Sequence, residues 1–254
     1  MKQLTFQKVK LFGFCIFLSL LPVLSNYSAV SATAKQIKCN PKVNCPVGSI
    51  GPGGGVVFYV SSKEQPWGRF IEVAQDGWNK GGKDPKSIWC DSKYVINPDL
   101  TVDVPEDANE IKFVDPHHRQ WEGTFIGQGL QNTNKMLGLC KKGAANLARD
   151  YRGGGKSDWL LMSVNDAMAL CRFIFGDSTS NFEESNPRCN PGNKQQPPKG
   201  LKSITLGSTL WTSNEIDYEF ATQVIFNSSP KGVLNTGGWP KNQFSSVRPI
   251  RYFK

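Results

Sequence analysis

Apolar residues between positions 132 and 176 follow a helical spacing that glycines interrupt once. From about residue 133 to residue 151, apolar and small side chains recur every three or four positions, which places them on one face of a helix. They are Met136, Leu139, Cys140, Gly143, Ala144, Leu147 and Tyr151. Glycines 153–155 should end this helix, because glycine adopts left-handed backbone conformations at little cost. The apolar face is therefore expected in the core.

A short strand and a second helix are predicted after the glycines. Residues 160–162 are apolar and have the length of a short buried strand. Ser163 then stands where a helix N-cap is expected, and Asp166 follows at the capping-box position. Apolar residues continue at helical spacing to Phe175, and Gly176 is expected to end the helix.

Strands are predicted on both sides of this helical region. Residues 56–60 are β-branched or aromatic and follow a glycine-rich turn, and residues 68–74 supply a partner strand across a loop at 61–67. Further strands are expected at 209–213, 220–226 and 245–253. In the last of these, Arg248, Arg251 and Lys254 alternate with apolar residues, which predicts one solvent-exposed face. The pattern as a whole indicates an α+β fold with two main helices packed on small antiparallel sheets and long ordered loops.

Two segments are polar and irregular, residues 79–124 and residues 177–207. We expect ordered loops in the first and a polar surface insertion in the second. The acidic residues of the first segment lack the spacing of a calcium loop, and its adjacent histidines lack further ligands, so no metal site is predicted. The residues concerned are Asp103, Glu106, Asp107, Glu110, His117 and His118.

The N-terminal segment has the pattern of a secretory signal peptide. Three lysines precede an apolar run at 11–24, and the small residues Ala32 and Ala34 form a cleavage site. The run is interrupted by polar residues and is shorter than the roughly 20 apolar residues of a membrane-spanning helix. We therefore expect a signal peptide at 1–34, a short lead-in at 35–46, and one domain at 47–254 that is secreted or cell-surface, without a membrane span after cleavage.

Net charge indicates the kind of partner. The whole chain has a formal charge of +9, and removal of the three lysines of the signal peptide lowers it to +6. For an exported basic protein, an anionic polysaccharide or another cell-surface polymer is a more suitable partner than nucleic acid. The alternative is that the charge only keeps the protein soluble.

The cysteines predict disulfides. Six remain after cleavage, and an even number in an exported chain is most simply explained by three disulfides, although six cysteines allow 15 pairings. The expected pairs are Cys39 with Cys45, Cys90 with Cys140, and Cys171 with Cys189. A zinc site is not predicted, because the sequence has no CxxC pair.

The first helix also carries the candidate ligand-binding residues. Lys135, Lys142 and Arg149 are seven residues apart, a spacing that returns to nearly the same side of a helix. Arg152 and Lys156 would continue this cationic stripe into the glycine turn. Successive stripe charges would be roughly 10 Å apart, which suits repeating sulfates or carboxylates on a polysaccharide. The competing interpretation is an ordinary solvated helix face.

Two glycine-rich motifs do not predict a nucleotide or another cofactor. The GGGKS motif at 153–157 has Asp150 where a phosphate-binding loop requires glycine, and it follows a predicted helix rather than a strand. Glycines 51–55 precede a strand, whereas a phosphate-binding loop precedes a helix. Both motifs are interpreted as structural turns.

Four ordered motifs resemble a known family. They are GSIGPGGGVVFYV (48–60), ANLARDYRGGGKSDW (145–159), WTSNE (211–215) and VRPIRYF (247–253), and the chain resembles the Lcl C-terminal domain family, long filed as a domain of unknown function. The resemblance implies a C-type-lectin-like fold, related in architecture to formylglycine-generating enzymes. A bacterial collagen-like adhesin of the family binds sulfated glycosaminoglycans, and the resemblance implies an extracellular binding domain of mixed helix and strand, which makes glycosaminoglycan binding one expectation. This sequence lacks the collagen repeat, so its oligomeric state stays open, and it lacks the reactive cysteine pair of the enzymes.

Three classes of function are compatible with these patterns. The leading hypothesis is a non-catalytic binding domain for carbohydrate or a sulfated or anionic polymer. A hydrolase acting on cell-surface glycans is the second, with Asp158 and Glu215 as acid and base, although both could simply form salt bridges with Arg248 and Arg251. A structural envelope protein that contacts other proteins is the third.

Overall fold

The computed structural model describes residues 37–92, 125–175, 197–226 and 235–254. The chain divides into two units, residues 1–35 and 36–254, and all the elements below belong to the second. The expected signal peptide, the acidic residues at 103–110, His117 and His118, and Cys189 lie outside the described residues.

Two sheets make up the strand content of the described chain. The first has four antiparallel strands in the order β1 (Val56–Gln65), β2 (Gly68–Val73), β9 (Pro249–Phe253) and β4 (Leu160–Leu161). The second has the order β3 (Lys86–Ser87), β8 (Ser245–Ser246), β5 (Thr209–Glu215), β6 (Phe220–Ile225) and β7 (Asn235–Pro240). The pair β5–β8 is parallel and the other pairs are antiparallel.

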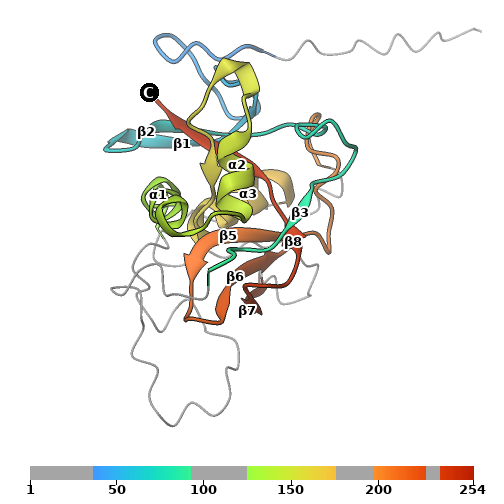
Figure 1. Ribbon diagram of the computed structural model, residues 1–254. Coiled ribbons are helices and arrows are strands. Elements are labelled where there is room, and N and C mark those ends of the chain that lie inside the picture. Colours follow the sequence, from blue (N-terminus) through green and yellow to red (C-terminus); the bar gives the residue numbers. More distant parts are fainter. Residues whose placement is uncertain (1–36, 93–124, 176–196, 227–234) are drawn as a thin grey trace, which may run out of the picture. The chain divides into compact units, whose positions relative to one another are not determined.

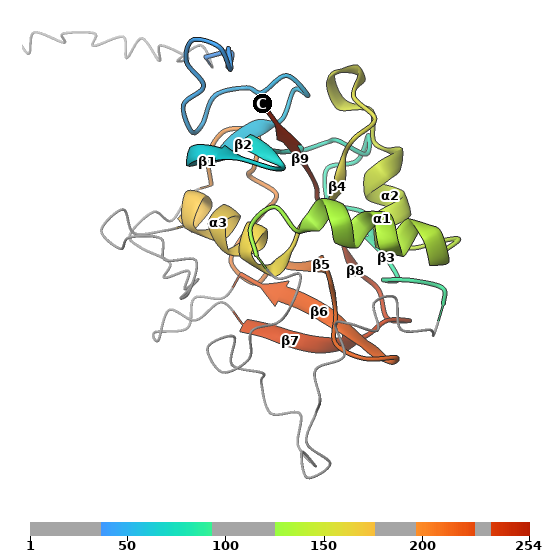
Figure 2. The ribbon, with the colours of Figure 1, turned by 90° about the vertical axis from the view of Figure 1, so that its left-hand side faces the viewer.

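In the described residues, three α-helices lie between the two sheets (Figures 1 and 2). They are α1 (Gly129–Leu139), α2 (Ala144–Asp150) and α3 (Val164–Phe175). Both α1 and α3 contact strands of the two sheets, so the largest cluster of buried apolar side chains includes residues of α3 and of both sheets. The mixed α+β class expected from the sequence is confirmed.

The capping box predicted for the second helix is confirmed. The Asp166 backbone N–H donates to Ser163 Oγ at 3.2 Å, and the Ser163 N–H donates back to Asp166 Oδ2 at 2.8 Å. Two N–H groups that no helical carbonyl can accept are thereby satisfied, which explains why α3 begins at Val164.

The single helix predicted at 133–151 is wrong, because the chain forms α1 and α2 with a break between them. Gly143 is the reason: it pairs with Cys90 in a β-bridge and has φ of +153°, which is not a helical value. A Cβ atom at this position would lie 2.3 Å from the Trp89 carbonyl oxygen. Leu139, expected in the core, is instead 50% exposed.

The last strand also differs from its prediction. Residues 245–253 form two strands, β8 and β9, and β9 is buried along its whole length between β2 and β4. Arg248 and Arg251, expected on a wet face, are buried. Each is accommodated by carboxylates: Arg251 pairs with Glu72 and Asp158, and Arg248 pairs with Asp84. Charge pairing rather than solvent therefore explains the alternation of arginine and apolar residues.

Two connections are tighter than expected. The loop predicted at 61–67 is mostly strand, since β1 continues to Gln65 and pairs there with Gly68. The described part of the polar insertion, residues 197–207, is anchored in the core by Leu201 and Ile204, which are fully buried. The other residues of this part are half-buried or exposed, so it lies at the surface and is tied to the core at two points.

Two of the predicted disulfides are confirmed, Cys39–Cys45 and Cys90–Cys140. The second joins the residue after α1 to the segment that follows Trp89, as expected. Cys171 is also disulfide-bonded, and its expected partner Cys189 lies outside the described residues.

Candidate functional site

A groove of about 760 Å³ lies between the β1–β2 turn and α1. Residues of the turn form one wall, and α1 with the segment leading into it forms the other. Within the described part of the chain, the lining consists of Gln65, Pro66, Trp67, Ile126, Gly127, Gln128, Leu130, Gln131, Asn134 and Lys135. Lys135, one of the predicted ligand-binding residues, therefore belongs to a concave surface.

The groove combines an aromatic ring with many neutral hydrogen-bonding groups. Four of its residues carry carboxamides, which donate and accept hydrogen bonds at once: Gln65, Gln128, Gln131 and Asn134. Trp67 adds an aromatic surface and Lys135 adds one positive charge. None of the described lining residues is acidic. The groove is thus suited to a hydroxyl-rich ligand that is neutral or negatively charged.

Close packing fixes the Trp67 ring. A Cβ atom at position 127 would lie 1.9 Å from Trp67 Cδ1, so the ring fits only because Gly127 has no side chain. Gly127 also has φ of +91°, which favours glycine. The ring also packs at a tilt against Tyr252, with the centroids 5.3 Å apart. Trp67 is therefore half-buried and held in one orientation.

A buried carboxylate and a buried phenol hold the segment at the start of α1; we call this pair, Asp166 and Tyr252, the Tyr252 hub. The Tyr252 hydroxyl donates to Asp166 Oδ2 at 2.5 Å and accepts the Gly129 N–H at 3.1 Å. Asp166 Oδ1 accepts the Gly127 N–H, also at 3.1 Å. Burial raises the pKa of Asp166, and burial beside that carboxylate raises the pKa of Tyr252 well above its ordinary value. The hub thus fixes two glycines of the groove region.

The predicted cationic stripe does not exist as one helix face, because the helix breaks within it. Lys135 lies on α1, Lys142 is exposed in the connection, and Arg149 lies on α2. Arg149 is nevertheless brought near the groove, since its Nη2 donates to Asn134 Oδ1 at 2.9 Å. Burial lowers the pKa of Arg149. The structure thus brings Lys135 to the groove and Arg149 to its edge, but leaves Lys142 outside.

The other two predicted cations serve the chain itself or lie elsewhere. Arg152 Nη1 donates to the carbonyls of Arg149 and Tyr151, at 2.5 and 2.9 Å, which satisfies acceptors at the end of α2. Lys156 follows the 3-10 turn Gly153–Gly155 and is half-buried. Neither residue lines the groove.

The two candidate catalytic carboxylates have different surroundings. Glu215 is buried and pairs with the Lys241 ammonium, so its expected pairing with Arg248 or Arg251 is wrong. Asp158 does pair with Arg251, at 2.5 Å, and its side chain is half-exposed. Neither carboxylate lines the groove. Each has its own cationic partner, Arg251 for Asp158 and Lys241 for Glu215.

The glycine-rich turn at 51–55 binds a carboxylate of the protein itself. The Glu72 carboxylate is fully buried and accepts the N–H groups of Gly53 and Gly55, both at 2.9 Å. Arg251 Nη1 donates to the same carboxylate at 3.0 Å. The structural interpretation of this turn is confirmed: its amides are occupied by a side chain of the neighbouring strand.

The described residues show neither a metal-binding cluster nor a membrane-spanning helix. Among them, no group of three or more histidine, cysteine, aspartate or glutamate side chains is arranged to hold a metal ion. No helix in these residues has the length and apolar character needed to cross a membrane. Comparison with known proteins found no matching family model, no matching curated protein and no matching solved structure.

Sequence reasoning missed most of the groove. The one feature of the sequence that could have indicated the groove is the carboxamide-rich run GQGLQNTN at 127–134. This run was overlooked because the helix prediction depended on the spacing of apolar residues. Trp67 is 60 positions or more from these residues in the chain, and the pairing of β1 with β2 helps to place it beside them. A sequence pattern confined to one helix could not have joined the two walls.

Proposed function

We propose that this protein is an extracytoplasmic, non-catalytic carbohydrate-binding domain, and that the groove between the β1–β2 turn and α1 is its ligand site. The observation that carries the proposal is the composition of the groove: one fixed tryptophan ring, four carboxamides and one lysine, with no acid among the described lining residues. Pockets of this kind combine an apolar surface with a few well-placed polar groups.

The chemistry of the lining matches a sugar. Carboxamides of Gln128, Gln131 and Asn134 offer donors and acceptors together, as paired sugar hydroxyls require. The Trp67 ring offers a flat apolar surface for the C–H face of a pyranose ring. Lys135 adds an attraction for a sulfate or carboxylate on the sugar, so the preferred partner is an anionic polysaccharide or cell-surface polymer.

Two further observations support the proposal. Disulfides form and persist in oxidising compartments, and the chain has at least the pairs Cys39–Cys45 and Cys90–Cys140. The mixed arrangement of three helices and two small sheets is compatible with the C-type-lectin-like architecture that the resemblance to the Lcl C-terminal domain family implies. We therefore extend the proposal to that architecture.

A glycan-array measurement on the oxidised protein tests the function. We compare the double variant Gln131→Ala, Lys135→Ala with the control Lys142→Ala, which removes a lysine from an exposed position outside the groove. Loss of two polar contacts should weaken binding at least about tenfold, whereas the control should stay within about twofold. Equal binding by the double variant and the control would refute the groove as the site, and no bound glycan at all would refute the function.

A further inference from the structure

A second surface, distinct from the groove, is formed by the segment at residues 76–86, which we call the lysine loop. It connects β2 to β3 and carries Lys80, Lys83 and Lys86, all exposed. A fourth exposed lysine, Lys202, joins it because the Lys202 N–H donates to Asp76 at 2.6 Å. Within the described part of the chain, these four lysines form no ion pair.

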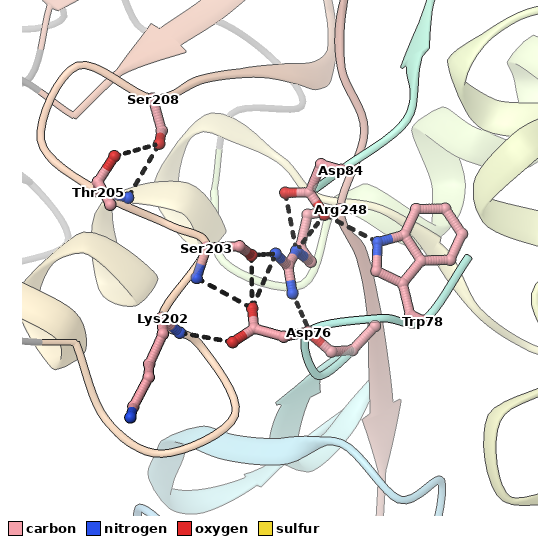
Figure 3. A network of polar contacts seen from close by, with 9 residues as sticks. Asp76, Trp78, Asp84, Lys202, Ser203, Thr205, Ser208 and Arg248 are labelled. Atoms are coloured by element: carbon pink, nitrogen blue, oxygen red, sulfur yellow. Dashed lines mark hydrogen bonds and ion pairs between the residues drawn. The ribbon is translucent and has the colours of Figure 1, made fainter. Parts of the chain in front are cut away.

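One buried arginine fixes both ends of the lysine loop (Figure 3). Arg248 has no exposed surface, and its Nε donates to Asp84 at 2.9 Å. Its Nη2 lies 3.4 Å from Asp76, and its Nη1 donates to the Ala74 carbonyl at 2.8 Å. The two acids of the loop thus pair with a buried guanidinium, whereas the lysines of the loop are exposed to solvent.

The loop has further internal contacts that hold its shape. Trp78 Nε1 donates to Asp84 at 2.8 Å, and the Trp78 ring packs edge-on against Tyr151 with the centroids 5.4 Å apart. Lys80 has φ of +57°, a left-handed conformation that residues other than glycine adopt at a cost. Asp76 also accepts the Ser203 N–H at 3.2 Å, and in Figure 3 the Lys202 side chain extends away from this network. The lysines are therefore displayed by an ordered loop.

Charge and residue type indicate the partner. Four lysines and Arg248 against two aspartates leave this region with a formal charge of +3. The exposed cations are all lysines, which act as point charges toward phosphate, and none is an arginine with a planar fork for bidentate recognition. Among the described residues, no exposed large apolar side chain falls at 76–86. The lysine loop could therefore attract an anionic membrane by charge, but it has no apolar side chain to insert into one.

We propose that the lysine loop binds a polymer of phosphate or phosphodiester units in solution, independently of the groove. The folded loop has little conformational entropy to lose on binding, since Arg248 and Trp78 already hold it. Its three lysines recur every third residue, which gives a repeating polyanion several charges to contact. Binding of this kind is electrostatic, and it should weaken steeply with salt.

The test measures binding of inorganic polyphosphate at low and at moderate salt. The triple variant Lys80→Gln, Lys83→Gln, Lys86→Gln is compared with a control of equal charge, Lys63→Gln, Lys141→Gln, Lys142→Gln, whose lysines are exposed elsewhere. We expect affinity to fall at least tenfold in the loop variant and less than threefold in the control, with glycan-array binding unchanged in both.

Three outcomes would overturn the proposal. Equal losses in the two triple variants would mean that net charge alone attracts the polymer. A loss of heparin binding without a loss of polyphosphate binding would assign the loop to sulfated glycans. Binding to phosphatidylglycerol vesicles but not to polyphosphate would assign it to a lipid surface. Because the glycan array reads the groove separately, failure of this proposal is distinguishable from failure of the proposed function.

Discussion

Substitution of Gly143 by alanine tests why the chain forms two helices where the apolar pattern predicts one. Gly143 lies between α1 and α2 with φ of +153° and ψ of −169°, a backbone conformation that is essentially confined to glycine. Its pairing with Cys90 brings the backbone of this connection against the Trp89 carbonyl. We expect Gly143→Ala to lower the free energy of unfolding severely.

The magnitude follows from two contributions. Forcing alanine into this conformation costs about 1–3 kcal/mol. The new Cβ would also lie 2.3 Å from the Trp89 carbonyl oxygen, which must move. That oxygen accepts the Ala144 N–H at 3.1 Å, so its displacement costs about 1 kcal/mol more. The expected loss is about 2–4 kcal/mol.

The assay is urea unfolding followed by tryptophan fluorescence, with the disulfides intact. Gly138→Ala is the matched control, because Gly138 lies within α1 and a Cβ there meets nothing within 4 Å. Alanine in an exposed helical position is favoured over glycine by roughly 0.5–1 kcal/mol, so this variant should be more stable than the wild type. A loss below about 1 kcal/mol for Gly143→Ala, or the same sign for both variants, would refute the reasoning.

Three further predictions concern charge, covalent links and the groove. The pKa of Asp76 is lowered, because hydrogen bonds from its neighbours and a nearby guanidinium outweigh its burial, whereas burial raises the pKa of Asp84, both from an ordinary 3.8. The lowered pKa of Asp76 therefore stabilises the fold above about pH 4, and this stabilisation is lost as the pH falls. The raised pKa of Asp84 stabilises the fold at low pH, and that stabilisation is lost as the pH rises. When unfolding is measured at pH 3–6, acid should destabilise Asp76→Asn less than the wild type and Asp84→Asn more. Replacing Cys90 and Cys140 by serine opens a loop with a sequence separation of 50 and should cost about 4 kcal/mol in urea unfolding. Tyr252→Phe removes the hydroxyl of the Tyr252 hub and should cost about 1–3 kcal/mol in the same assay while weakening glycan binding, and unchanged binding would show that the hub does not position the groove.

Local patterns predicted elements better than they predicted burial. The glycine turn before β1 and the capping box of α3 were readable from spacing, because each depends on residues close in sequence. The two confirmed cysteine pairs were one choice among the 15 pairings that the sequence leaves open. The exposure of Leu139 was not readable, since the Cys90–Gly143 bridge that interrupts the helix joins distant segments. Arg248 and Arg251 were misassigned for a related reason: their carboxylate partners lie far back in the chain.

The candidate site was predicted only at Lys135. Basic residues at a spacing of seven identify a helix face only while the helix continues, and here it ends before Lys142. The residues that give the groove its character are neutral, and a charge pattern cannot identify them. Trp67 in particular acquires its role from Gly127 and Tyr252, which a one-dimensional pattern does not connect to it.

The position of β9 between β2 and β4 has a consequence for the order of folding. Val73 of β2 pairs with Ile250 of β9, and nearly the whole domain separates the two residues in the sequence. The pairing of β9 with β2 and with β4 therefore needs the C-terminal end of the domain. Contacts between such distant positions form slowly, so the first sheet is expected to be completed late in folding. Closure of the Cys90–Cys140 link beforehand would shorten the remaining search, so oxidation should accelerate the final assembly of this sheet.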